Sequence, residues 1–118
     1  MLLNLSNHPS AHWPPEQMEA ALRQYGPVAD LPFPAIDPHW DEAQVAALAT
    51  EYVDKVLGQA PTAVHVMGEL TFVFHFVANM RQWPGAPPCV ASTSQRKVIE
   101  PQPGQKLVTF NFVRFRPY

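Results

Sequence analysis

The chain has 118 residues, of which 47% are hydrophobic and 15% charged; this is enough for one domain with a buried core and excludes a disordered segment. A single cysteine, Cys89, excludes a disulfide framework and a cysteine-based zinc site. The net charge of −2 is unevenly spread, because residues 1–95 hold three Lys or Arg against nine Asp or Glu, and residues 96–118 hold five against one. This composition allows a local anion site but not an extended basic stripe for duplex nucleic acid.

The N-terminal residues lack the basic and long apolar segments of a signal peptide. The most apolar run, residues 70–78, has about half the length of a membrane span. We therefore expect a single domain over residues 1–118 that is cytoplasmic, with no membrane contact. No cluster of carboxylates or cysteines has metal-ligand spacing, so we expect neither a metal nor a cofactor.

The first segment of the chain predicts a strand followed by a helix. Residues 2–6 form a short apolar run that ends in the polar segment Ser6-Asn7-His8-Pro9, as in a buried strand that enters a loop. Pro14 and Pro15 suit the first turn of a helix. Apolar residues then recur at helical spacing until Gly26-Pro27 ends the pattern.

A second strand and helix follow. Residues 28–33 read as a strand that Pro32 and Pro34 limit. Asp41 and Gln44 form a variant of the capping box that opens a helix, and Gly58 suits the position after its end. The apolar face of this helix is predicted at Val45, Leu48, Ala49, Tyr52 and Val56.

The remaining elements are predicted from residue 63 onward. Residues 63–67 form a third strand, and a largely buried helix runs from the segment Gly68-Glu69-Leu70-Thr71 to about Trp83. Residues 89–93 form a fourth strand, and two further β runs flank the turn at 101–104. The pattern predicts an α/β fold, a Rossmann-like three-layer sandwich with a mostly parallel sheet of four strands plus a C-terminal antiparallel hairpin.

Ligands of open parallel sheets bind at the carboxyl ends of the strands, near the point where the strand order reverses. The residues that leave those ends are hydroxyls, amides, one glycine and one arginine, a set that suits a phosphate near a helix N-terminus. They are Ser6, Asn7 and His8 after the first strand, Gly68, Glu69 and Thr71 after the third, and Ser92, Thr93, Ser94 and Arg96 after the fourth. Each feature also has an ordinary interpretation: Gly68 as a tight turn, the Ser-Thr-Ser segment as turn chemistry, and mid-strand His65 as a core histidine.

The side chains of the last predicted strand should point alternately to the two faces of the sheet. Arg114 and Arg116 would then share a face with Val108, Phe110 and Phe112. They are either a solvated strand end or phosphate ligands beside Arg96, because guanidinium groups match phosphate oxygens. No dinucleotide fingerprint, P-loop, zinc-protease motif or nucleophile elbow occurs.

The order of these elements resembles the CRISPR-associated Rossmann fold (CARF). The resemblance lies in a strand that enters Gly68-Glu69-Leu70-Thr71 and a buried helix, followed by a strand that ends in Ser92-Thr93-Ser94. CARF domains bind cyclic oligoadenylates made during type III CRISPR antiviral defence, and some small stand-alone members are ring nucleases. The resemblance therefore implies a nucleotide-binding protein that binds a cyclic oligoadenylate and that could cleave it without metal by attack of a ribose 2′-OH on the adjacent phosphate.

For this reaction we assign His8 to proton transfer, Glu69 as a reserve base and Arg96 as the electrostatic clamp. A two-fold symmetric ring predicts a homodimer, with the Trp13 and Trp40 loops and the C-terminal strand as candidate surfaces. Two alternatives remain open: a non-catalytic module that senses a nucleotide or docks a protein partner, and an enzyme that acts on another phosphate-bearing small ligand.

Overall fold

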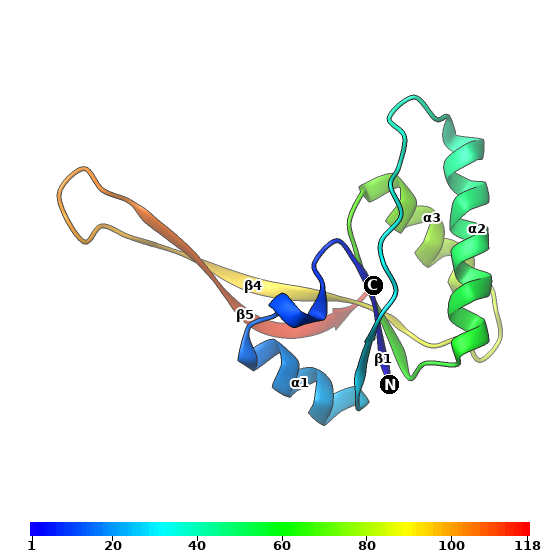
Figure 1. The fold of residues 1–118 in the computed structure, drawn as a ribbon, viewed down its shortest axis with the longest axis horizontal. Helices are drawn as coiled ribbons and strands as arrows, with labels where there is room; N and C mark the ends of the chain where they lie inside the picture. Colours follow the sequence, from blue (N-terminus) through cyan, green and yellow to red (C-terminus); the bar gives the residue numbers. More distant parts are fainter.

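The computed structural model describes all 118 residues as a mixed α/β fold (Figure 1). One five-stranded sheet has the order β2-β1-β3-β4-β5, with parallel pairing up to β4 and an antiparallel β4–β5 pair. The strands are β1 (Leu2–Ser6), β2 (Val28–Asp30), β3 (Ala63–Met67), β4 (Cys89–Ile99) and β5 (Leu107–Pro117). The helices are η1 (Ser10–His12, 3₁₀), α1 (Pro15–Tyr25), α2 (Glu42–Gln59) and α3 (Leu70–Met80). None of the helices is long and apolar enough to cross a bilayer.

The two faces of the sheet carry separate cores. Leu3 and Leu5 of β1 belong to the larger core, which packs against α2 and α3. Leu2, which points to the opposite face because side chains alternate along a strand, belongs to a smaller core with α1 and Phe115 of β5. Both faces of β1 are therefore buried, which explains its nearly unbroken apolar sequence.

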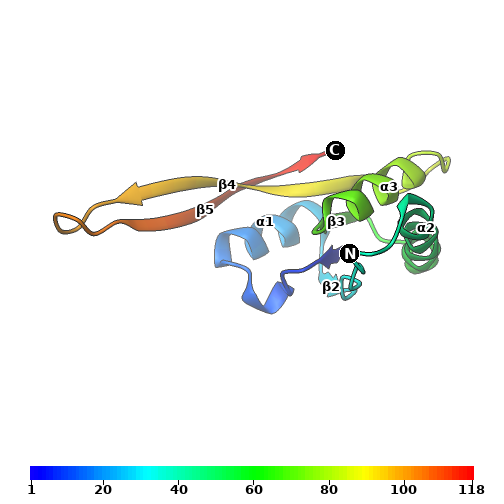
Figure 2. The same cartoon turned by 90° about the horizontal axis from the view of Figure 1, so that it is seen from above.

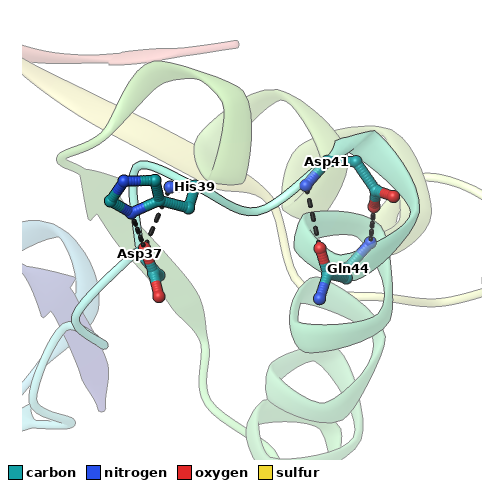
Figure 3. Close-up of polar contacts among 4 residues, drawn as sticks. All are labelled: Asp37, His39, Asp41 and Gln44. Carbon is teal, nitrogen blue, oxygen red and sulfur yellow. Dashed lines mark hydrogen bonds and ion pairs between the residues drawn. The ribbon is translucent and has the colours of Figure 1, made fainter.

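The predicted capping box opens α2 (Figure 3). The Gln44 amide donates to Asp41 Oδ1 at 2.9 Å, and the Asp41 amide donates to Gln44 Oε1 at 3.0 Å. The other end of the helix differs from the prediction. Gly58 lies inside the last turn, and Ala60 caps the helix in the left-handed conformation with φ 48°.

The second and fourth strands also differ from their predicted lengths. β2 ends at Asp30, because Pro32 and Pro34 remove the amides that a longer strand needs. β4 does not stop at Thr93 but continues to Ile99, so it is itself the first half of the hairpin. The sheet therefore has five strands rather than four with an added hairpin. The sequence does not show that the fourth strand continues into the next β run, because the residues from Ser94 onward are exposed and pack against no core.

Val90 is the last residue of β4 that pairs with β3. Beyond it, β4 and β5 pair only with each other and extend away from the rest of the sheet as a two-stranded arm (Figure 2). The longest dimension of the molecule is 52 Å, and the chain reverses at Gly104, whose φ of 82° suits glycine. The arm exposes large apolar side chains, namely Val98, Ile99, Leu107, Val108, Phe110 and Val113.

A bulge in the arm overturns the predicted alternation of β5. Thr93 pairs with Arg114 and Ser94 pairs with Phe112, so Val113 is the extra residue. One extra residue moves all later side chains to the other face of the sheet. Phe115 consequently joins the face of α1, whereas Arg114 and Arg116 point to the opposite face.

Gly68 follows β3 and lies against the ring of Phe33. A Cβ at Gly68 would come within 2.4 Å of Phe33 Cζ, whereas a Cβ at Gly58 would meet nothing within 4 Å. We expect Gly68→Ala to lower the free energy of unfolding by about 1–3 kcal/mol through overpacking. Gly58→Ala, the control, should raise it by up to about 1 kcal/mol through helix propensity. Urea unfolding measures both, and equal stabilities for the two variants would contradict the packing against Phe33.

Candidate functional site

A cavity of about 490 Å³ lies at the carboxyl ends of β1 and β3, on the face of the sheet that carries α1. β1 and β3 are neighbours in the sheet, and their following helices, α1 and α3, pack on opposite faces. The cavity therefore lies where the strand order reverses, as ligand sites of open α/β sheets do. It is lined by His8, His12, Trp13, Pro14 and Gln17 from the β1–α1 segment and by His65, Met67, Ser92, Ser94 and Phe110 from the sheet.

A chain of hydrogen-bonded polar side chains reaches this cavity through His65 and Ser92, which line it. His65 Nδ1 lies 2.9 Å from Asn4 Oδ1, and His65 Nε2 lies 3.2 Å from Ser92 Oγ. Asn4 Nδ2 donates to Asp30 Oδ1 at 2.8 Å. Asn4 and His65 are register partners on adjacent strands, and both are 1% exposed. The chain thus runs from Asp30 through Asn4 and His65 to Ser92.

The direction of each hydrogen bond in this chain follows from its partners. Asn4 Nδ2 faces two oxygens that can only accept, the Asp30 carboxylate and the His8 carbonyl, so the amide orientation is fixed. Asn4 Oδ1 must then accept from His65 Nδ1–H. His65 Nε2 is left without a proton and accepts the hydroxyl proton of Ser92.

His65 is neutral at pH 7 because of its surroundings. Burial lowers its pKa from 6.5 to about 4, and the nearby charge of His8 acts in the same direction. Trp13 and Phe115 contact the ring edge to face, with centroids 5.1 Å and 5.7 Å away. At the other end of the chain, burial raises the pKa of Asp30, but hydrogen bonds from Asn4 and Ser10 outweigh this and hold it below its ordinary value.

The loop after β1 is fixed by the main-chain oxygen of His8. This oxygen accepts from Asn4 Nδ2, Ser6 Oγ and Trp13 Nε1 at 2.9, 3.1 and 3.1 Å. Trp13 is buried in the smaller core, so its own side chain offers little surface to a partner, whereas its neighbours in the loop are exposed. Trp40 is half-buried against the larger core.

Three of the predicted site residues, His8, Ser92 and Ser94, line the cavity. Ser6 lies behind it, because its hydroxyl is buried against Asn4 Oδ1 at 2.8 Å. Asn7 is exposed and lies outside the lining. Thr93 points away, as its position between two cavity-facing serines requires, and donates to the Arg114 carbonyl at 3.0 Å.

The predicted cradle residues after β3 lie outside the cavity. Glu69 caps α3: its carboxylate accepts from the Phe72 amide at 2.8 Å and from the Thr71 amide and hydroxyl at 3.1 and 2.7 Å. These bonds, the Thr71 hydroxyl first, lower the pKa of Glu69 and make it a weaker base. Gly68 packs against Phe33 instead of a ligand. The structure therefore gives Gly68, Glu69 and Thr71 local structural roles.

Of the predicted arginines, only Arg96 shares the face of the cavity. Arg96 is paired in register with Phe110, which lines the cavity, and paired residues of antiparallel strands point to the same side. Arg114 and Arg116 lie on the other face because of the bulge at Val113. Their predicted place beside Arg96 is therefore wrong.

Sequence reasoning missed the role of Asn4 and reduced His65 to a core residue. His65 is indeed buried and hydrogen-bonded, as a satisfied core histidine should be, but it also faces the cavity. The available signal was a polar residue at the centre of each of two mostly apolar strands, Asn4 in Leu2–Ser6 and His65 in Ala63–Met67. That these two residues pair could be found only from the register of β1 against β3 in the structure.

Comparisons with known proteins identify a family. The model described as "Uncharacterized protein MJ1673 family" matches residues 1–116, and the chain therefore belongs to this family. No curated protein and no solved structure matches the chain.

The buried His65 predicts a specific dependence of stability on pH. Its pKa is about 4 when folded and 6.5 when unfolded, so the unfolded chain binds more protons as the pH falls below 6.5. We expect the free energy of unfolding to fall between pH 6.5 and 4.5, toward a full loss on the order of 3 kcal/mol.

Urea unfolding of wild type, His65→Gln and His75→Gln at several pH values tests this. His65→Gln should be less stable at pH 7 and nearly independent of pH in this window. His75→Gln, which changes a half-buried histidine of α3 that lies near the start of α2, should keep the wild-type slope. If the free energy of unfolding of His65→Gln falls with pH as steeply as that of wild type, His65 does not cause the pH dependence.

Proposed function

We propose that this member of the MJ1673 family binds a cyclic oligoadenylate in the cavity beside His65. The observation that carries the proposal is the composition of the cavity wall at the carboxyl edge of the sheet. Trp13 and Phe110 offer aromatic surface for an adenine ring, and Ser92, Ser94 and the histidines offer polar groups for ribose and phosphate. Arg96, on the same face, supplies a cation for a phosphate.

The strand order supports the resemblance to CARF domains. The order β2-β1-β3-β4 with parallel pairing is that of doubly wound nucleotide-binding sheets, and the helices pack on both faces. We therefore retain the Rossmann-like three-layer description as part of the proposal. A cytoplasmic setting in antiviral defence goes with it, because CARF ligands are made during CRISPR defence.

The proposed reaction is cleavage of the ring without metal. A ribose 2′-OH attacks the adjacent phosphorus in line, the bond to the 5′-oxygen breaks, and a 2′,3′-cyclic phosphate forms. Such a reaction needs a fixed geometry and preorganised donors. His8 lines the cavity and is the residue that we assign to protonation of the leaving 5′-oxygen.

A homodimer is part of the proposal. A cavity of about 490 Å³ is in the range of sites for one small molecule, so a ring of four or six nucleotides overfills it. Two cavities related by a two-fold axis would match the symmetry of the ring. The exposed apolar side chains of the arm, such as Ile99 and Val108, would then be buried against the second copy.

The alternative, a non-catalytic module that docks a protein, is favoured by one observation. The outer side of α3 exposes Leu70 and Phe74, which are 81% and 67% accessible. With Val77, Ala78 and Tyr118 they line a mostly apolar hollow of about 390 Å³. Exposed apolar patches of this kind mark protein contacts.

Incubation with labelled cyclic tetra- and hexa-adenylate, with and without EDTA, tests the proposal. We expect a thermal shift with one of the rings and cleavage to linear products ending in a 2′,3′-cyclic phosphate, unaffected by EDTA. Binding without turnover would favour the sensing module. The absence of any thermal shift with either ring would overturn the nucleotide proposals and leave the docking module.

The same binding assay locates the site through a pair of neighbouring cations. Arg96→Ala should weaken ring binding about tenfold or more, because a charge-assisted bond to phosphate is lost. Lys97→Ala, the control, removes a cation from the next position of the same strand, on the opposite face. Equal affinities of the two variants would show that the ring binds elsewhere.

A further inference from the structure

Ser92 presents its oxygen to the cavity in a particular way. Its hydroxyl proton points to His65 Nε2 at 3.2 Å, because Asn4 fixes the His65 tautomer from the other side. Met67 Sδ, also 3.2 Å from Ser92 Oγ, is a much weaker acceptor than a ring nitrogen. The lone pairs of Ser92 Oγ are therefore free to accept a hydrogen bond from a hydroxyl group in the cavity.

We propose that Ser92 is a catalytic residue that passes the proton of the attacking 2′-OH to His65, with Asn4 and Asp30 as positioning residues. This inference rests on the proposed ring cleavage. It gives a role to a polar chain that ligand binding alone does not need. It makes His65 the base in place of Glu69, because His65 lines the cavity and Glu69 does not.

In the proposed cleavage, Ser92 and His65 remove the proton of the attacking hydroxyl and His8 supplies a proton to the leaving oxygen. The 2′-OH donates its proton to Ser92 Oγ while the proton of Ser92 moves to His65 Nε2. The 2′-oxygen forms a bond to phosphorus, and the bond from phosphorus to the 5′-oxygen breaks. His8, on the cavity wall, protonates the 5′-oxygen. His65 then returns its proton to Ser92, Ser92 releases its extra proton to solvent, and His8 takes up a proton from solvent, which restores the starting state.

The geometry around His65 suits a base that works through another residue, although burial and the charge of His8 lower its pKa to about 4 and so oppose its protonation. Its Nδ1–H bond to Asn4 holds the ring orientation, as the third group does in nucleophile–base–orienter arrangements. The titratable groups nearest the ring are His8 and His12 on the cavity wall and Asp30 behind Asn4. The Asp30 carboxylate reaches the ring only through Asn4, so in this proposal it acts by holding the Asn4 side chain in place.

The test is the single-turnover cleavage of cyclic tetra-adenylate, or of the hexa-adenylate if that ring binds, by Ser92→Ala and Ser92→Thr, with ring affinity measured in parallel. We expect Ser92→Ala to bind within about threefold of wild type but to cleave about 100-fold more slowly, as for loss of a general base. Ser92→Thr restores a hydroxyl and should recover most of the rate. Thr109→Ala, the control, removes a hydroxyl from the opposite face of the same strand pair and should cleave like wild type.

A pH profile separates a proton relay from a structural role. His65 stays neutral well below pH 6, so wild-type cleavage should lose no rate to this group between pH 8 and 5.5. In wild type, protonation of His65 at still lower pH should reduce the cleavage rate. In Ser92→Ala this decrease should be absent, because His65 no longer takes part in the remaining slow cleavage. Wild-type cleavage with an unchanged rate in Ser92→Ala would overturn the relay alone. Failure of the wild type to bind either ring would overturn the proposed function and the relay with it.

Discussion

The hydrogen bond between His65 and Asn4 is the constraint on which the carboxyl edge of the sheet depends. It joins β1 and β3 in register, and it holds a buried imidazole that is bonded at both nitrogens and that burial keeps neutral at rest. Asp30, the last residue of β2, holds Asn4 from the other side, and Ser92 belongs to β4, so four strands contribute to one polar chain. The open end of that chain is the Ser92 oxygen in the cavity.

The arm is the second determinant of the site, since it decides which cations reach the cavity. If Val113 paired regularly instead of forming a bulge, Arg114 and Arg116 would share the face of Phe112. Because Val113 bulges, the face of the cavity has one arginine, Arg96, in an otherwise aromatic and polar setting. A weakly charged cavity with one cation fits a small phosphate-bearing ligand better than a polyanionic duplex.

Local pattern was sufficient for most elements. Strands Leu2–Ser6 and Ala63–Met67, and the capped start of α2, follow from apolar periodicity and end signals. The full extent of β4 does not follow from local pattern, because the polar half of this strand pairs only with β5 and packs on no core. The bulge at Val113 and the pairing of Asn4 with His65 are non-local, since they depend on register between segments up to 61 residues apart. The contact of Asn4 with His65 and the face on which Arg114 and Arg116 lie therefore could not be predicted from the sequence.

The most direct test of the central hydrogen-bond chain is the tautomer of His65, measured by ¹⁵N NMR of histidine-labelled protein between pH 8 and 5. The chain predicts a protonated Nδ1 and an unprotonated Nε2, with no titration of this ring near pH 6.5. Protonation at Nε2, or a titration midpoint near 6.5, would contradict both the direction of the chain and the role given to Ser92.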